Sequence, residues 1–174
     1  PNNGIVLLAQ HLDDQLETVL LQLKRGAGPK GLAAMGHCLE TERDIRMLRP
    51  LLNTSRAEIE DYAQAYRLDW QEDESNLNTR FDRNFLRHQI VPLLTQRWPE
   101  LPAAVKRSAE LCARQNALVT EVCAERLSTM LSSQDGLNVD KLTAQSLAWQ
   151  AELVRYWLSS QGVPLPSMAI TEQI

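Results

Sequence analysis

The stretch HLDDQLE, residues 11–17, places one histidine and three carboxylates directly after an apolar run at residues 5–9. On a helix, Asp14 and Glu17 are three positions apart and therefore project close together. Carboxylate oxygens suit Mg²⁺ with its nucleotide, and clustered acids also suit the capture of a substrate ammonium group. Acids in a first helical turn also stabilise the helix dipole by about 0.3–1 kcal/mol. The motif therefore indicates either a ligand site or an ordinary acidic helix start.

A second group of polar residues lies in the stretch DRNFLR, residues 82–87. Arg83 and Arg87 are four positions apart, so on a helix both guanidinium groups point the same way, with Asn84 beside them. Guanidinium groups match phosphate oxygens bidentately. The alternative is that these arginines form structural salt bridges with the acids at residues 72–74. The spacing alone leaves both interpretations open.

The elements that must position these residues alternate between strand and helix. The run at 5–9 predicts a strand buried on both faces, as in a parallel sheet under helices. Residues 12–25 have a helical period of apolar residues, and residues 44–52 predict a second strand. This alternation indicates an α/β sheet. Open α/β sheets bind ligands outside the carboxyl ends of their strands, which is where HLDDQLE begins.

Local signals set the ends of the predicted helices. Gly26 is expected to be the C-cap of the helix at 12–25. Thr54 or Ser55 is expected to cap the next helix, with Glu58 completing a capping box. Residues 69–80 are polar and predict a loop or a short strand with turns.

After residue 80 the sequence predicts almost only helices. The stretch RFDRNFLRHQI is amphipathic, and Pro92 should break or kink it or begin the next turn. One long helical pattern covers residues 101–131. Thr143 is expected to cap a last helix that ends near Gly162, and Ser167 to cap another.

Composition restricts the class of protein. The 174 residues are 44% hydrophobic and 23% charged with a net charge of −4, which is typical of a soluble globular chain. The apolar runs are too short to span a membrane, and the three cysteines form no C-x-x-C motif. Residues 80–114 carry seven Lys or Arg against three acids, whereas residues 37–79 carry five Arg against ten acids. The basic segment is either a solvated helix face or a phosphate-binding strip.

Four stretches in order carry a family resemblance: AQHLDDQLETVLLQLKRGAGPKGLAAM, then RPLL, WQEDESN and DRNFLRHQIVPLLTQRWP. Over roughly residues 5–100 they resemble bacterial tRNA(Ile)-lysidine synthetases, which belong to the PP-loop ATP pyrophosphatases. The resemblance implies the C-terminal part of a Rossmann-like parallel-sheet ATP-binding domain at 1–80. A connecting helix at 81–100 and a helical tRNA- or substrate-binding domain at 101–174 would follow.

The resemblance implies an activity and its partners. The family uses ATP to adenylate the ring carbonyl oxygen of the wobble cytidine in an isoleucine tRNA with a CAU anticodon. The side-chain amine of L-lysine then displaces AMP. ATP, Mg²⁺, L-lysine and this tRNA are thus the expected ligands, and the cytoplasm the expected location, with no membrane partner.

Residue roles follow from the same resemblance, position by position. Asp14 and Arg83 are expected to be catalytic, and His11 and Asp13 are expected to bind ATP together with Asp14. Lysine would be bound by Asp14, Glu17 and Arg83. The tRNA would be bound by Arg83, Asn84 and Arg87. No metal ligand is assigned.

The sequence departs from the family pattern in two places. Gln10 stands where the family has the first His of H-H-x-D-D, and the phosphate loop S-G-G-x-D-S does not occur in the chain. Because backbone N–H groups of such a loop cradle pyrophosphate, this chain alone is expected to be a fragment without activity. A PP-loop tRNA thiolase and a non-catalytic tRNA-binding module are the competing interpretations.

Overall fold

The computed structural model describes residues 4–40, 45–71, 74–131 and 136–163. The chain divides into two compact units, Pro1–Arg114 and Gln115–Ile174. This division falls inside one long helix, whereas the boundary expected from the sequence lies at residue 101, which stays a prediction. No helix in the described ranges is long and apolar enough to cross a membrane.

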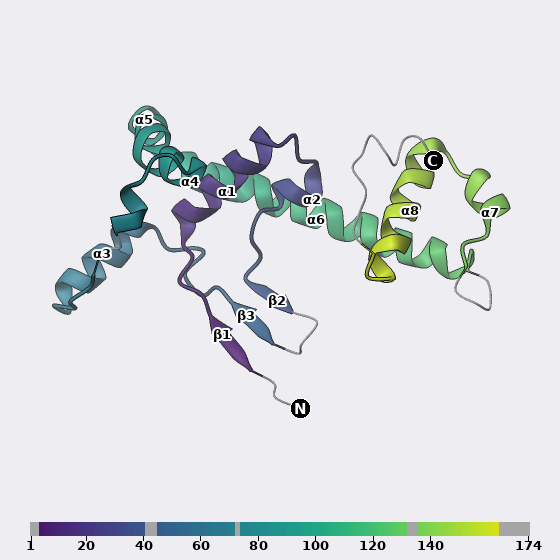
Figure 1. Ribbon diagram of the computed structural model, residues 1–174, viewed down its shortest axis with the longest axis horizontal. Helices are drawn as coiled ribbons and strands as arrows, with labels where there is room; N and C mark the ends of the chain where they lie inside the picture. Colours follow the sequence, from purple (N-terminus) through teal and green to yellow (C-terminus); the bar gives the residue numbers. More distant parts are fainter. Residues whose placement is uncertain (1–3, 41–44, 72–73, 132–135, 164–174) are drawn as a thin grey trace. The chain divides into compact units, whose positions relative to one another are not determined.

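Unit 1 contains a three-stranded sheet in the order β1-β3-β2 (Figure 1). Strand β1 (Ile5–Leu7) pairs in parallel with β3 (Arg46–Leu48), and β2 (Cys38–Glu40) pairs antiparallel with β3. The expected α/β class is confirmed, although the sheet is mixed. The third strand, β2, was not expected, because three residues are too few to give a period.

The expectation that the first strand is buried on both faces is wrong for this chain. Ile5 and Leu7 are 62% and 68% exposed. Only β3 pairs with β1, and the strands extend away from the helices of unit 1, so that no described helix covers them (Figure 1). An apolar run of this kind is typical of a buried strand. Whether the strand is buried depends on which other segments pack against its faces.

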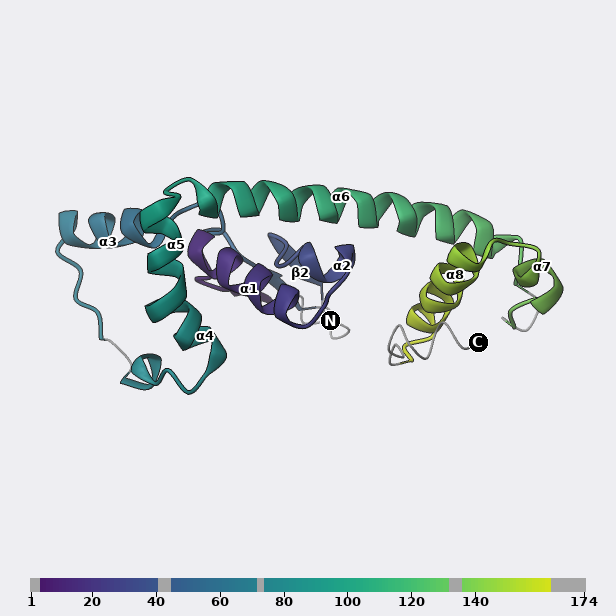
Figure 2. The ribbon, with the colours of Figure 1, turned by 90° about the horizontal axis from the view of Figure 1, so that it is seen from above.

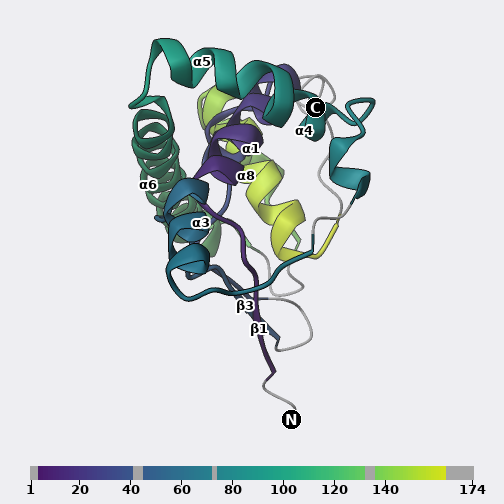
Figure 3. The ribbon, with the colours of Figure 1, turned by 90° about the vertical axis from the view of Figure 1, so that its left-hand side faces the viewer.

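The first two long helices begin and end where local chemistry predicts. Helix α1 (Leu12–Lys24) is followed by Gly26 with a φ of 66°, a conformation that glycine adopts without strain. Helix α2 (Pro29–Leu32) is short. Helix α3 (Arg56–Ala65) has Ser55 as its N-cap, and Glu58 completes the predicted capping box. Figure 3 shows the N-terminal ends of α1 and α3 close together.

The segment after residue 80 forms one nearly continuous helical rod beside α1 (Figure 2). A 3₁₀ turn, η1 (Glu74–Leu77), precedes it. The rod consists of α4 (Asp82–Phe85), a π-helical stretch η2 (Leu86–Ile90) and α5 (Val91–Arg97). Pro92 lies in the first turn of α5, so the expected disturbance takes the form of a widened turn just before the proline.

The core of unit 1 joins α1 to the segments around it. Its most buried apolar side chains are Leu16 from α1, Leu52 after β3, and Ala109 from α6 (Leu101–Ser128). Leu16 and Leu52 are exposed by only 0% and 1%. Burial of Leu16 fixes the face that α1 presents, and with it the direction of the acidic side chains in its first turns.

Unit 2 contains the end of α6, then α7 (Val139–Thr143) and α8 (Leu147–Ser160) (Figure 2). Cys123, Met130 and Leu153 form its buried core. The expectation that Thr143 caps the last helix is wrong, because Thr143 ends α7 and Ser146 is the N-cap of α8. The helix ends before Gly162 as predicted. Ser167 lies outside the described residues.

Candidate active site

The site is built on the first turns of α1. His11 is the N-cap, and its backbone N–H donates to Asp14 Oδ2 at 3.0 Å. The His11 ring folds back over the same turn, with Nε2 3.4 Å from Asp14 Oδ2. These contacts fix one carboxylate oxygen of Asp14 against the helix start.

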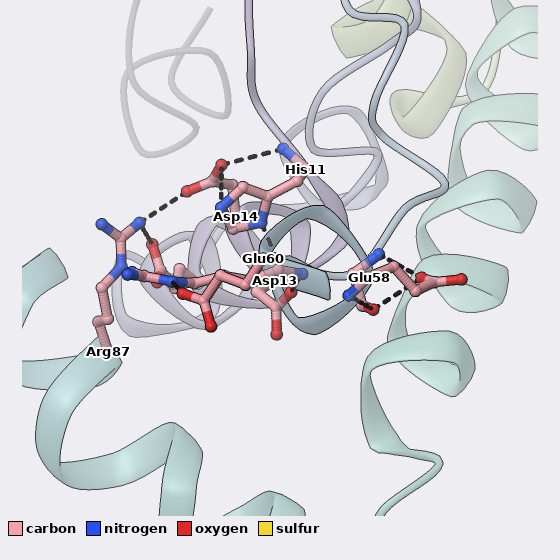
Figure 4. Close-up of polar contacts among 9 residues, drawn as sticks. His11, Asp13, Asp14, Glu58, Glu60 and Arg87 are labelled. Carbon is pink, nitrogen blue, oxygen red and sulfur yellow. Dashed lines mark hydrogen bonds and ion pairs between the residues drawn. The ribbon is translucent and has the colours of Figure 1, made fainter. Parts of the chain in front are cut away.

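A guanidinium group from the helical rod, that of Arg87, joins Asp14 and Glu17 of α1, and Figure 4 shows its contact with Asp14. Arg87 donates through Nε to Glu17 Oε1 at 2.6 Å and through Nη2 to Glu17 Oε2 at 2.9 Å. The same Nη2 donates to Asp14 Oδ1 at 2.7 Å. The predicted proximity of Asp14 and Glu17 is thus confirmed, and a single arginine from 70 residues later contacts both carboxylates.

Burial makes this ion pair necessary to the fold. The Glu17 side chain is 2% exposed and the Asp14 side chain 10% exposed. A buried carboxylate without a partner is strongly disfavoured, and removing its partner costs more than the intact pair contributes. Hydrogen bonding to the Glu17 carboxylate, which accepts from Arg87, is the main reason that the pKa of Arg87 is raised, so the guanidinium remains charged.

Arg83 lies one turn earlier and makes looser contacts. Its Nε is 3.7 Å from Glu17 Oε2, and Nη2 donates to Thr18 Oγ1 at 2.9 Å. The Arg83 side chain is 40% exposed, against 22% for Arg87. The two arginines therefore balance the two acids, but Arg83 keeps more of its surface open to a ligand.

Asp13 faces away from this cluster and toward α3. Its Oδ2 accepts the backbone N–H of Arg56 at 2.8 Å and lies 3.5 Å from Nδ1 of His11. The His11 ring is the largest cause that lowers the pKa of Asp13, and the Arg56 N–H adds to it, while burial opposes the shift. Asp13 is therefore an ionised link between the starts of α1 and α3.

Three polar residues position the segments around the site. The buried Gln15 side chain donates to the Met35 carbonyl at 2.7 Å and accepts the Met35 N–H at 3.0 Å. Arg49 donates to Gln10 and, at 2.9 Å, to the Gly36 carbonyl. Local sequence patterns do not predict the anchoring role of Gln15 or Arg49, because only the fold brings them near their partners, which are backbone groups of Met35 and Gly36 and the Gln10 side chain.

Asn84 is buried and holds the segment before its helix by hydrogen bonds. Its Nδ2 donates to the carbonyls of Ser75 and Asn78, both at 3.0 Å. The proposed tRNA contacts of Asn84 and Arg87 stay predictions, although both side chains have partners inside the protein. The alternative pairing of the arginines with Glu72, Asp73 or Glu74 rests on side chains that the structure does not describe and stays a prediction, while Arg87 pairs with two acids of α1.

A cavity of about 360 Å³ lies beside His11, at the carboxyl ends of β1 and β3. Most of its lining is apolar, and Arg56, Glu60 and Asp69 contribute polar groups. This volume is in the range of small-ligand sites. His11 therefore borders a cavity on one side of α1, while Asp14 and Glu17 face the arginines on another.

The donor groups around the start of α1 decide whether the site could hold a metal ion by itself. Within these ranges no three His, Cys, Asp or Glu side chains come together as a metal-binding group. The oxygens of Asp14 and Glu17 are engaged by hydrogen bonds from His11 and Arg87. Within the described part of the chain, the acids at the start of α1 therefore do not form a Mg²⁺ site by themselves in this arrangement.

Comparison with known proteins assigns the chain to a family. The PP-loop domain model matches residues 2–94, and the TilS substrate binding domain model matches residues 137–174. The chain therefore belongs to the PP-loop family, with a C-terminal segment that matches the TilS substrate binding domain. The resemblance found in the four motifs is confirmed.

Individual relatives are similar along nearly the whole chain. A tRNA(Ile)-lysidine synthase of Vibrio cholerae is 49% identical over 170 residues, which cover 98% of this chain and 38% of the relative. One of Pectobacterium atrosepticum is 51% identical over 168 residues, covering 93% of this chain and 37% of the relative. The chain thus spans little more than a third of the length of these relatives.

Proposed function

We propose that the chain is part of an enzyme that joins L-lysine to the wobble cytidine of a tRNA(Ile) with a CAU anticodon, at the expense of ATP. The carrying observation is the pair of buried acids at the start of α1, held by an arginine of the helical rod. The similarity to proteins named tRNA(Ile)-lysidine synthase supports this choice among PP-loop reactions.

The proposed reaction has two steps. The ring carbonyl oxygen of cytidine attacks the α-phosphorus of ATP, and the bond to pyrophosphate breaks. The lysine amine nitrogen then forms a bond to the ring carbon, the carbon–oxygen bond to AMP breaks, and the nitrogen loses a proton. The adenylate is required because an unmodified carbonyl oxygen is a poor leaving group.

We assign the following roles to this chain's residues. Asp14 and Glu17 supply the negative charge that attracts and orients the amine, and Arg83, the more exposed arginine, faces the reacting groups. His11 and Asp13 hold the nucleotide side of α1, where His11 borders the cavity. Mg²⁺ would enter with the ATP phosphates, which are its usual ligands in such sites, and would neutralise their charge.

Lysine incorporation by the full-length natural protein tests this proposal. Wild-type protein should attach labelled lysine to a tRNA(Ile) transcript with release of pyrophosphate. Asp14→Asn should lower kcat/KM by on the order of 100-fold with an unchanged Kd for tRNA, and Asp61→Asn, in an exposed acid of α3, should leave both unchanged. The 174-residue chain by itself should release no pyrophosphate, since it lacks the Ser-Gly-Gly phosphate loop.

Two results would favour the competing functions. Tight tRNA binding without lysine incorporation by the wild-type protein would indicate a binding module. Pyrophosphate release that depends on a sulfur donor instead of lysine would indicate a thiolase.

A further inference from the structure

The contacts of Arg87 connect Glu17 to Asp14 through a single guanidinium group. Glu17 accepts two hydrogen bonds from Arg87, and Arg87 donates a third to Asp14 Oδ1. The other oxygen of Asp14 accepts from the His11 backbone. We propose that Arg87 is a positioning residue that fixes Asp14 for the amine, with Glu17 acting on the ligand through Arg87. This inference rests on the proposed function.

Burial separates the roles of the two acids. The Glu17 side chain is 2% exposed, and Arg87 engages both of its oxygens. A ligand amine therefore finds little of Glu17 to contact while the pair is intact. The Asp14 side chain is 10% exposed, and its carboxylate has further lone pairs beyond the two that its partners use. Asp14 is the acid that can present charge to the amine.

The orientation of Asp14 is determined from two sides. Arg87 holds Oδ1 at 2.7 Å and the His11 N–H holds Oδ2 at 3.0 Å (Figure 4). With both oxygens held, rotation of the carboxylate is restricted before any ligand arrives. Such preorganisation matters because a misplacement of about 1 Å at a reacting group can cost on the order of 100-fold in rate.

The backbone around Arg87 suits this role. Arg87 lies in the π-helical stretch η2, in the widened turn that precedes Pro92. Arg83, in the regular turn before it, reaches Thr18 and approaches Glu17 only to 3.7 Å. Arg83 and Arg87, whose spacing would also suit phosphate binding, therefore make different contacts. Arg87 is the one that pairs closely with Asp14 and Glu17.

Steady-state kinetics of the full-length protein test this role. Arg87→Met should raise the KM for lysine by on the order of 100-fold and leave the KM for tRNA and the Kd for tRNA unchanged. Arg87→Lys, which keeps one ion pair but loses the bidentate geometry, should recover part of the affinity for lysine. The control Arg67→Gln, an arginine near the end of α3, should leave all constants unchanged.

A double-mutant cycle keeps the test valid if Arg87→Met fails to fold. Glu17→Gln and Arg87→Lys should each raise the KM for lysine. The double variant should have a KM for lysine close to that of one single variant, because both substitutions interrupt the same contacts from Glu17 through Arg87 to Asp14. If the two substitutions raised the KM for lysine independently, so that their fold-changes multiplied in the double variant, the inference would be overturned.

Two further outcomes separate this inference from the proposed function. An unchanged KM for lysine in a folded Arg87 variant, or a loss confined to tRNA binding, would overturn the positioning role while lysine incorporation by the wild type still stands. A wild-type protein that incorporates no lysine would overturn the proposed function itself.

Discussion

Asp13 shows how two adjacent acidic residues of one motif are directed to different partners. Asp13 and Asp14 are adjacent in sequence, but a helix turns them by about 100° relative to each other. Asp13 therefore meets the backbone of α3, and Asp14 meets Arg87. An adjacent pair of acids need not be a single functional unit.

The lowered pKa of Asp13 predicts a dependence of stability on pH. A carboxyl group whose folded pKa lies below its unfolded value of 3.8 stabilises the fold above that value. This contribution is lost as the pH falls through the lower, folded pKa. In urea unfolding, Asp13→Asn should therefore be less stable than wild type at pH 6, and the difference should shrink below pH ~3.8.

Asp61→Asn provides the control for this experiment, since Asp61 is an exposed acid on α3. Its unfolding midpoint should follow that of wild type across the pH range. A constant difference between Asp13→Asn and wild type from pH 6 to pH 3 would contradict the role of the ionised carboxylate.

At the scale of elements, the capping box of α3 makes a local and measurable contribution. Ser55 Oγ accepts the Glu58 N–H at 3.3 Å, and Glu58 Oε2 accepts the Ser55 N–H at 2.7 Å. Loss of an N-cap typically costs about 1 kcal/mol. Ser55→Ala should therefore raise amide hydrogen exchange in α3 by about fivefold. Ser159→Ala, near the end of α8, should not change exchange in α3.

The boundaries of α1 and α3 could be predicted because their signals are local. Gly26 and the pair Ser55 and Glu58 act within a few residues of the ends they define. Thr143 shows the limit of such signals. Asn138, Thr143 and Ser146 are all suitable caps within nine residues, and packing decides that Thr143 lies inside α7 and Ser146 begins α8.

The site could be predicted only in part, because only some of its contacts follow from local spacing. The spacing of Asp14 and Glu17 predicts a shared face, and that of Arg83 and Arg87 predicts a second one. Which arginine reaches the acids depends on how the helical rod lies against α1, and no local pattern contains this information. The buried Gln15 and Asn84 donate to backbone carbonyls outside their own helices, so their residue types alone do not reveal the role.

At the scale of the whole molecule, the structure divides the basic segment into internal and external charges. Arg87 is engaged by two acids, and Lys106 lies 3.7 Å from Glu110. Arg80, Arg97, Arg107 and Arg114 are exposed. Exposed charges are more available to a polyanion, so Arg97 and Arg107 are two of four candidates for contacts with tRNA phosphates.

Salt dependence of tRNA binding distinguishes these two groups of charges. Each phosphate contact contributes up to about one unit to the slope of log K against log salt, because binding releases counterions. The double variant Arg97→Gln with Arg107→Gln should therefore flatten the slope for the full-length protein by about one to two units. Arg87→Lys should keep the wild-type slope, because its charge remains and faces the acids of α1. Arg67→Gln, which removes a charge in the acidic segment, is the matched control. An unchanged slope in the double variant would contradict phosphate contacts by Arg97 and Arg107 and would favour a solvated helix face at these positions.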